Sequence, residues 1–444
     1  MARTYFDLFP QTFVTSLMSL EFREKLQKRR LKKLVTYAKE NSPFFAELYK
    51  DVNKNFVLAD LPPVTKKQMM DNFDDYVTDR AIKKADVAAF LAGPGNYDSK
   101  LHGKYVVATT SGSTGLQACV VNDRSSQNIK DALMSVRAFQ ARIPFAILCS
   151  SDGYGITNVT TRDNIKKVPF LKYFLRSFES KKAAAELVEE LNKFRPKVIC
   201  GFPGTLMLLT EDPYAGKLRI KPSIVLTSGE YLTDYSRRKL QETFNCPVHS
   251  MYACTEGGFM AFECKKNRLH VNNDWVILEA VDDDFNPVPD GTLSQKTLVT
   301  FLGNKVQPII RYELTDRTIL HNERCECGRA GPWIEVEGRT NDMLRFEGKN
   351  GGTVTVAPMS FLDIIEEVPG VQSYQVILRG RNKIELRLVP DLNSDINDVC
   401  SLIEKRILDY LRYLNVDDAV MYLSDKRPQR DPVSGKFRQI YQEA

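Results

Sequence analysis

Apolar and polar positions first follow two helical stretches and then alternate between strands and helices. Apolar residues recur at helical spacing from Phe22 to Glu40, and Thr65 predicts the start of a helix after Pro62 and Pro63. The predicted buried strands are Tyr105–Ala108, Ile147–Ser150, Val198–Cys200, Ile224–Thr227 and Val248–Tyr252, with helices at Lys181–Phe194 and Asp234–Phe244 and an added β region at Leu298–Leu302 and Ile309–Tyr312. Strands that alternate with helices indicate a mostly parallel sheet.

A different pattern follows from about residue 341 to the C-terminus. The predicted elements are strands at Met343–Glu347, Ser373–Leu378 and Lys383–Leu388, a helix at Ile396–Leu414, a strand at Ala419–Leu423 and a basic loop at Arg427–Arg438. The expected fold class is therefore α/β. We expect a large N-terminal domain with mixed sheets over residues 1–340 and a small α+β C-terminal domain over residues 341–444.

Composition places the chain among globular proteins. Of its 444 residues, 43% are hydrophobic and 27% charged, which excludes disorder, collagen and coiled coil for the whole chain. No apolar run approaches the ~20 residues of a membrane-spanning helix, so we expect no membrane insertion. The formal net charge of +6 is scattered and lacks interleaved aromatics, which predicts no nucleic-acid partner. Nine cysteines, mostly in apolar settings, favour reduced thiols and a cytoplasmic location.

A loop rich in hydroxyl groups is the candidate for binding phosphate, because the sequence has no P-loop motif and no dinucleotide fingerprint. The loop follows a predicted strand and consists of Thr109, Thr110, Ser111, Gly112, Ser113, Thr114 and Gly115. Backbone N–H groups of such a loop converge on a phosphate, and the hydroxyls add donors. Alone, an ordinary turn would give the same pattern.

Further motifs follow this loop in a fixed order. They are Leu226–Glu230, Tyr252–Gly258, Arg311–Asp316, Gly338–Asp342 and Pro428–Lys436. In order and spacing the set resembles the adenylate-forming superfamily of acyl-CoA synthetases and adenylation domains. The resemblance is strongest to the phenylacetate–CoA ligase-like branch and its relatives from capsule and coenzyme biosynthesis, and it runs from about residue 60 to the C-terminus.

The resemblance implies an ATP-dependent ligase that works in two steps. A small carboxylic acid, expected to be an aryl or medium-size acyl acid, attacks the α-phosphate of ATP and gives an acyl-adenylate and pyrophosphate. Coenzyme A then displaces AMP and forms a thioester. Two anions must meet in the first step, so Mg²⁺ is expected as well. The C-terminal domain is expected to be mobile, with its hinge at Asn341.

The resemblance also implies which residues bind the nucleotide. The loop Thr110–Gly115 would hold the phosphates, and Gly229 and Glu230 would lie along the adenine. Tyr252 would stack near the adenine. Asp316 would accept the ribose hydroxyls, and Arg339 would contact the ribose.

The same resemblance implies the catalytic residues. Thr255 would bond the α-phosphate, and Glu256 would hold Mg²⁺ through its hard carboxylate oxygens. Lys436 would reach the acid's carboxylate and the α-phosphate as a point charge during adenylation. Without the order of the motifs, Glu256 would be an ordinary helix-start acid and Lys436 a solvated lysine.

The sequence departs from the family's pattern at three places, one of which is Leu314–Asp316, where Thr-Gly-Asp is usual. Leu116 and Gln117 stand where the phosphate loop usually continues with Lys, so one positive contact to pyrophosphate is missing. Gly351–Thr355 replaces the segment that is common after the hinge, which leaves the acceptor open. An amine, a hydroxyl or a carrier protein is an alternative to coenzyme A, and a binding protein without turnover is a third alternative. A homodimer is a further expectation.

Three cysteines and one histidine suggest a structural metal site. Cys264 and His270 stand close together, and Cys325 and Cys327 follow as a Cys-x-Cys pair before Gly328. Three thiols and an imidazole form a closed set that suits Zn²⁺, and similar pairs recur in the phenylacetate–CoA ligase-like branch. Loop thiols and a strand histidine are the alternative. Candidates for the acyl pocket are Tyr154, Phe202, Pro203, Cys254 and Phe259, all of which would also suit a core.

Overall fold

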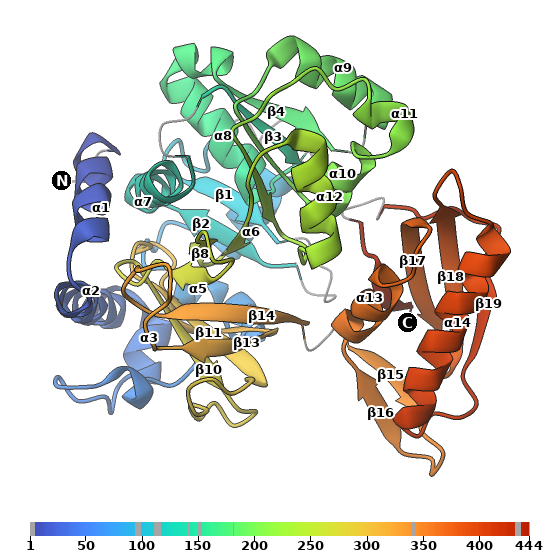
Figure 1. The fold of residues 1–444 in the computed structure, drawn as a ribbon. Coiled ribbons are helices and arrows are strands. Elements are labelled where there is room, and N and C mark those ends of the chain that lie inside the picture. The colour runs from blue at the N-terminus through green and yellow to red at the C-terminus, as the bar shows by residue number, and fades with distance from the viewer. Residues whose placement is uncertain are drawn as a thin grey trace.

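A computed structural model describes residues 5–93, 99–110, 117–139, 143–149, 153–180, 182–339, 343–430 and 437–443. A nine-stranded sheet dominates the large N-terminal part, in the order β13-β14-β9-β8-β7-β6-β5-β3-β4 (Figure 1). Its strands are β3 (Phe145–Cys149), β4 (Leu175–Glu179), β5 (Val198–Gly201), β6 (Ile224–Ser228), β7 (Val248–Cys254), β8 (Gly258–Glu263), β9 (Leu269–Val271), β13 (Asp316–His321) and β14 (Trp333–Arg339). Strands β3 to β7 pair in parallel, which confirms the predicted α/β region.

Helices cover both faces of the parallel strands. Strands β3 and β5 are buried along their whole length, as expected where a sheet is covered on both sides. Helix α12 (Asp234–Phe244) is held at its start by Thr233, whose side chain accepts from Ser236 N, and it ends at the left-handed Asn245. On the same face lie α9 (Ala184–Phe194) and α10 (Pro203–Leu208). Met134 of α7 (Arg124–Met134) packs on the opposite face.

The sheet continues beyond β7 with antiparallel strands that the sequence pattern did not predict. Strand β8 pairs antiparallel with both β7 and β9, and β14 joins β9 to β13. The predicted strand at Tyr105–Ala108 also differs: β1 (Val106–Thr109) pairs antiparallel with β2 (Cys119–Asn122) in a separate hairpin, not in the large sheet. Short buried runs reveal a strand but not its partner, because pairing depends on contacts distant in sequence.

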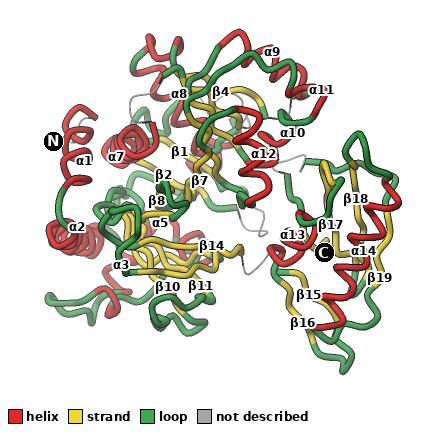
Figure 2. The backbone as a smooth tube through the Cα atoms, viewed as in Figure 1, coloured by secondary structure: helices red, strands yellow, loops and turns green. Residues whose placement is uncertain are grey.

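A three-stranded antiparallel sheet lies beside N-terminal helices (Figure 2). Buried residues of this sheet and of these helices belong to one large hydrophobic core. The strands of this sheet are β10 (Val276–Val281), β11 (Lys296–Phe301) and β12 (Ile309–Leu314). The remaining helical elements of the N-terminal part are α1 (Tyr5–Leu17), α2 (Leu20–Asn41), α3 (Pro43–Leu48), η1 (Leu58–Asp60), α4 (Lys66–Asp71), α5 (Phe73–Tyr76), α6 (Lys84–Ala92), η3 (Ser135–Phe139), α8 (Ile156–Lys167), η4 (Pro169–Tyr173) and α11 (Asp212–Ala215). The predicted helices at Phe22–Glu40 and after Thr65 correspond to α2 and α4.

The C-terminal part has sheets and a core of its own. Its elements are β15 (Leu344–Glu347), β16 (Thr353–Val356), α13 (Pro358–Glu366), β17 (Val371–Arg379), β18 (Lys383–Pro390), α14 (Ile396–Tyr413), β19 (Val420–Leu423) and β20 (Ile440–Glu443). This α+β arrangement confirms the expected fold class, whereas β16, α13 and β20 lack predicted counterparts. The domain boundary near residue 340 stays a prediction, because residues 340–342 lie outside the described part.

Two further findings concern the chain as a whole. Within the described ranges, no helix combines the length and the apolar character that a bilayer crossing requires. All nine cysteines belong to these ranges, and none of them forms a disulfide.

Candidate active site

A cavity of about 1540 Å³ opens where the parallel strands of the large sheet end. The residues at or just after the carboxyl ends of these strands that line it are Cys149, Gly201, Phe202, Ser228, Gly229, Cys254 and Thr255. Ligands of open α/β sheets bind at this edge, because the loops that leave the strands diverge there. The fold therefore places a large site where the sequence motifs converge.

The cavity brings together predicted residues from four separate motifs. Thr110, Gly229, Thr255, Glu256 and Asp316 all line it, although they are far apart in sequence. Of the other predicted residues, Ser111, Gly112, Ser113, Thr114, Gly115 and Lys436 lie outside the described residues.

Glu256 occupies the turn between β7 and β8, beside Thr255. Its carboxylate is buried and accepts a hydrogen bond of 2.9 Å from the hydroxyl of Tyr312 on β12. Burial and the neighbouring Glu256 raise the pKa of Tyr312 far above its ordinary value, so this hydroxyl is always a donor. One carboxylate oxygen is thus fixed by the protein, on a group that lines the cavity.

Asp316 begins β13 and also lines the cavity. Its carboxylate accepts a hydrogen bond of 2.7 Å from the Tyr252 hydroxyl, and its main-chain oxygen accepts from Thr297 at 2.8 Å. Arg339 is its backbone neighbour across the β13–β14 ladder. Three predicted nucleotide residues, Tyr252, Asp316 and Arg339, therefore meet at one edge of the sheet.

Lys130 is a cavity residue that the sequence did not single out. It is the buried lysine of α7, and its ammonium group donates to Asn122 Oδ1 at 2.8 Å and to the main-chain oxygen of Thr255 at 3.4 Å. Burial lowers the pKa of Lys130 to about 8, against the opposing effect of Cys254 and Glu256. These two acceptors, Asn122 and the Thr255 main chain, are neutral and do not cancel the charge of the protonated lysine. Lys130 therefore places a positive charge at the cavity, beside the Thr255–Glu256 turn. A lysine within a polar helix gives no sequence signal of such burial.

Glu230 lies next to the cavity residue Gly229, but its carboxylate points elsewhere. One carboxylate oxygen accepts from Gly204 N and the other from Phe437 N, each at 2.9 Å. The side chain therefore joins α10 to the C-terminal tail. This contact would leave the predicted role along the adenine to the backbone of this segment.

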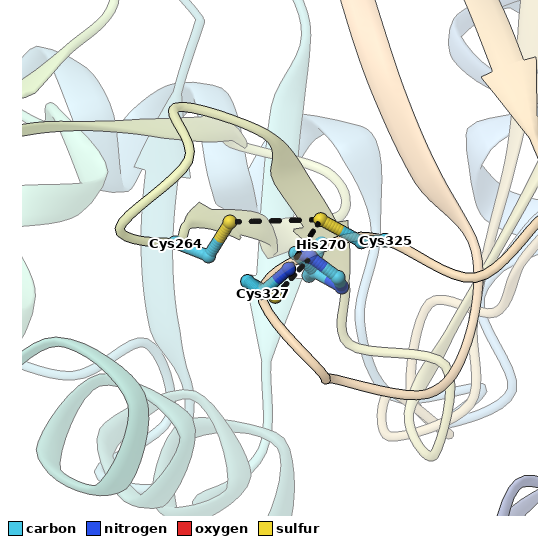
Figure 3. Close-up of side chains that lie close together, drawn as sticks. All are labelled: Cys264, His270, Cys325 and Cys327. Carbon is cyan, nitrogen blue, oxygen red and sulfur yellow. Dashed lines mark hydrogen bonds between the residues drawn. The ribbon is translucent and has the colours of Figure 1, made fainter.

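The predicted metal ligands converge beside β9, close to the start of β14 (Figure 3). The ligand atoms of Cys264, His270, Cys325 and Cys327 lie within 4.8 Å of one another. Cys264 Sγ is 4.0 Å from Cys325 Sγ, and Cys327 Sγ is 3.3 Å from His270 Nε2. Three of the four residues are buried, so the cluster is closed rather than open to substrate.

The surroundings of this cluster direct backbone N–H groups at two of its sulfurs and keep its imidazole neutral. Backbone N–H groups of Lys266 and Arg329 point at the sulfurs of Cys264 and Cys327, at 3.4 Å each. Burial, with Arg329 and Arg23 nearby, lowers the pKa of His270 to about 4, so its ring is neutral at pH 7. Three sulfurs and one neutral ring nitrogen match the donor set of structural zinc sites.

The acyl-pocket candidates divide into two groups. Tyr154, Phe202, Cys254 and Phe259 line the cavity, whereas Pro203 is buried in the first turn of α10. Phe145 and Ile147 of β3 and Met251 of β7 add an apolar wall that the sequence analysis did not assign.

Known proteins provide independent evidence on the fold. No protein-family model matches the chain. The chain is 27% identical over 387 residues to the phenylacetate–coenzyme A ligase of Thermus thermophilus, covering 82% of this chain and 80% of that relative. It is 23% identical over 391 residues to protein CapK of Staphylococcus aureus, covering 84% of this chain and 80% of the relative.

Solved structures agree with these relatives. A crystal structure of 2-hydroxyisobutyryl-CoA ligase in the postadenylation state, with 2-HIB-AMP, gives a TM-score of 0.73 at 16% identity, covering 96% of this chain and 90% of that chain. The chain has the fold of the adenylate-forming ligases. The predicted resemblance to this superfamily and to its phenylacetate–CoA ligase-like branch is confirmed.

The arrangement of the N-terminal and C-terminal parts can be compared with two states of one ligase. The same 2-hydroxyisobutyryl-CoA ligase in its thioesterification state, with 2-HIB-AMP and CoA, gives a TM-score of only 0.58 at 17% identity, covering 98% of this chain and 92% of that chain. The arrangement described here is therefore closer to that ligase's postadenylation state.

Proposed function

We propose that the protein activates a carboxylic acid with ATP as an acyl-adenylate and transfers the acyl group to coenzyme A, releasing pyrophosphate and AMP. The observation that supports this most is the cavity, where Thr110, Gly229, Glu256 and Asp316 meet from four separate motifs. The similarity to the phenylacetate–coenzyme A ligase of Thermus thermophilus supports the same reaction class.

Adenylation must bring two anions together. Glu256 would hold Mg²⁺, since its carboxylate lines the cavity and Tyr312 fixes one of its oxygens. The ion would neutralise phosphate charge when bound. Lys130 adds a protein cation on the same side of the cavity, and Thr255 would donate to the α-phosphate. Lys436 would supply the charge that meets the acid's carboxylate.

Nucleotide binding would use both edges of the cavity. The loop Thr110–Gly115 would hold the phosphates, while Asp316 and Arg339 would contact the ribose. Gly229 and the ring of Tyr252 would lie against the adenine. The short hydrogen bond from Tyr252 to Asp316 would orient that carboxylate toward the ribose hydroxyls.

The acid would lie against the apolar wall of the cavity. Tyr154, Phe202 and Phe259 suit an aryl or medium-size acyl group, because flat rings pack against aromatic side chains. The small C-terminal domain, residues 341–444, would then move about its hinge to admit coenzyme A.

Zn²⁺ would bind at Cys264, His270, Cys325 and Cys327 and would stabilise the structure rather than take part in the chemistry. The donor set is complete and closed, and it joins β8 and β9 to the loop between β13 and β14. This loop follows the strand that begins with Asp316, so the metal would hold the ribose-binding edge of the sheet in place.

The experiment is an assay of pyrophosphate release over a panel of carboxylic acids, with and without coenzyme A. We expect acid-dependent release with one class of acids, and a thioester only when coenzyme A is present. Release without a thioester would favour an amine, a hydroxyl or a carrier protein as acceptor. No release with any acid would contradict the proposal.

The variant Glu256→Gln is the matched test of the site. It keeps the hydrogen bond from Tyr312 but removes the negative charge, so release should fall by roughly a hundredfold or more. Asp283→Asn, a change of the same kind at an exposed loop, is the control and should stay near the parent rate. The proposal also includes a cytoplasmic location and a homodimer, which cell fractionation and light scattering would check.

A further inference from the structure

The carboxylate of Glu230 binds the C-terminal tail, residues 427–443, at the residue after Lys436. Glu230 accepts the N–H of Phe437 through one oxygen and the N–H of Gly204 through the other, each at 2.9 Å. Gly204 belongs to α10 of the N-terminal part, whereas Phe437 is the residue after Lys436 in the sequence. Hydrogen bonds to an ionised acceptor are about twice as strong as neutral ones.

Gly204 is required for this close approach. A Cβ atom on residue 204 would lie 2.5 Å from Cβ of Phe437, a distance that real Cβ contacts do not reach. The tail therefore packs against bare backbone at this point. A side chain here would push Phe437 away from Glu230.

The tail is tied to the C-terminal part by a separate set of bonds. Gln375, buried on β17, donates from Nε2 to the main-chain oxygens of Gln429 and Arg438, at 2.9 Å each. Its Oε1 accepts from Gln429 N at 3.2 Å. These bonds anchor both sides of the segment from 430 to 437 within one part of the molecule. Glu230 connects Phe437, at the end of this segment, to the N-terminal part.

Charge supports the same contact. Burial lowers the pKa of Arg430, and the carboxylates of Glu230 and Glu179 oppose that effect. A cation of the tail thus faces two acids of the N-terminal part. The arrangement in which these groups meet is the one closer to a postadenylation state.

We propose that Glu230 and Gly204 form a latch that positions the tail for adenylation and that must open before the thioester step. This inference rests on the proposed function. Glu230 is then a positioning residue: it acts through the tail and not through the nucleotide. A latch of this kind affects one half-reaction and spares the other.

The test compares the two half-reactions in Glu230→Gln and Gly204→Ala. Both variants should lower the rate of acyl-adenylate formation by roughly ten- to a hundredfold, the range for losing one charge-assisted hydrogen bond. The KM for ATP should change by less than about threefold, because nucleotide contacts stay. Thioester formation from chemically prepared acyl-adenylate and coenzyme A should match the parent or exceed it.

Hydrogen exchange provides a readout that does not depend on activity. The peptide that contains residues 437–443 should exchange faster in both variants, because Glu230→Gln leaves one uncharged acceptor oxygen for two N–H donors and Gly204→Ala displaces Phe437. Glu211→Gln is the control: Glu211 also faces the tail, through Arg427, but Phe437 N donates to Glu230. This variant should leave exchange and both half-reactions at the parent level.

Three results would overturn the latch. One is unchanged exchange at residues 437–443 in Glu230→Gln and Gly204→Ala. The second is an equal loss in both half-reactions, and the third is a raised KM for ATP with adenylation kcat unchanged, which would make Glu230 a nucleotide contact. If the parent releases no pyrophosphate with any acid, the proposed function fails instead, and the exchange comparison alone decides whether Glu230 holds the tail.

Discussion

The buried Lys130 lowers the stability of the folded protein, but it places a positive charge at the candidate active site. Its ammonium group is buried between Asn122 and the Thr255 carbonyl, no carboxylate of the described residues makes a hydrogen bond to it, and its pKa falls to about 8. A lysine pKa that is lowered on folding means that the unfolded chain binds the proton more tightly. The cost of burying this charge is therefore fully present below pH 8 and fades as the pH rises toward the unfolded value.

Replacing Lys130 by Met should separate activity from stability. We expect Lys130→Met to lower adenylation by roughly a hundredfold, because a cation facing the phosphates is lost. The free energy of unfolding at pH 7 should change by less than about 2 kcal/mol, since relief of the buried charge offsets the lost hydrogen bonds. Denaturant unfolding and pyrophosphate release measure the two effects. Lys193→Met, on the exposed face of α9, is the control, and equal adenylation rates in Lys130→Met and parent would contradict this role.

Asp316 and Tyr252 make a second test at the residue scale. Asp316→Asn keeps the shape of the side chain but weakens its acceptor strength toward two ribose hydroxyls. The KM for ATP should rise by roughly tenfold or more, while the melting temperature stays close to that of the parent. Tyr252→Phe removes the hydroxyl that donates the 2.7 Å hydrogen bond to Asp316 and should raise the KM by a smaller factor. An unchanged KM in Asp316→Asn would place the ribose elsewhere.

At the scale of elements, the cysteine cluster connects strands that are not neighbours in the sequence. Cys264 follows β8, His270 lies on β9, and Cys325 and Cys327 precede β14, whose Trp333 pairs with His270. Purified protein should contain one zinc ion per chain by elemental analysis. Strong chelators should lower the melting temperature by roughly 5 °C or more, because metal binding contributes directly to folding.

Two substitutions distinguish the effect of the metal on the melting temperature from the effect of losing any thiol. Cys327→Ser should reproduce the chelator's effect and should not be destabilised further by chelation. Cys400→Ser, on α14 and distant from the cluster, should respond to chelators as the parent does. A parent protein that contains no zinc after purification without chelators would contradict the site.

The elements that the sequence predicted well are those with strong local patterns. Helix α12 and strand β6 match their predictions closely, because an amphipathic repeat and a continuous apolar run are local signals. The antiparallel extension from β8 to β13 was not predicted, since its pairing depends on partners distant in sequence. Glu256 and Asp316 could be found from their motifs. Lys130 and the tail contact of Glu230 could not, because burial and interdomain bonds arise only from tertiary structure.

At the scale of the whole molecule, the contact between the two parts contains a titratable group. Burial raises the pKa of Glu366 on α13 to about 7, and the neighbouring Asp363 raises it further, while Thr233, Tyr235 and Arg238 oppose the shift. Because this pKa is raised, Glu366 binds its proton more tightly in the contact than it does when exposed to solvent. The contact is therefore strongest below the ordinary glutamate pKa of 4.5 and weakens as the pH rises from there to about 7.

This contact should make the arrangement of the two parts depend on pH. We expect hydrogen exchange around Tyr235 and Val371, which share a hydrogen bond of 3.2 Å, to increase between about pH 5 and 7 beyond the intrinsic effect of pH. Glu366→Gln stays uncharged, so it should lose this dependence. An identical pH dependence in Glu366→Gln and parent would exclude Glu366 as its source.

The central claim is that separate motifs form one site for ATP and an acid. The most direct measurement is a crystal structure with a non-hydrolysable ATP analogue and Mg²⁺. We predict the ribose at Asp316, the metal at Glu256 and the phosphates between Thr110 and Lys130. A nucleotide bound outside this cavity, with Glu256 and Asp316 untouched, would contradict the account.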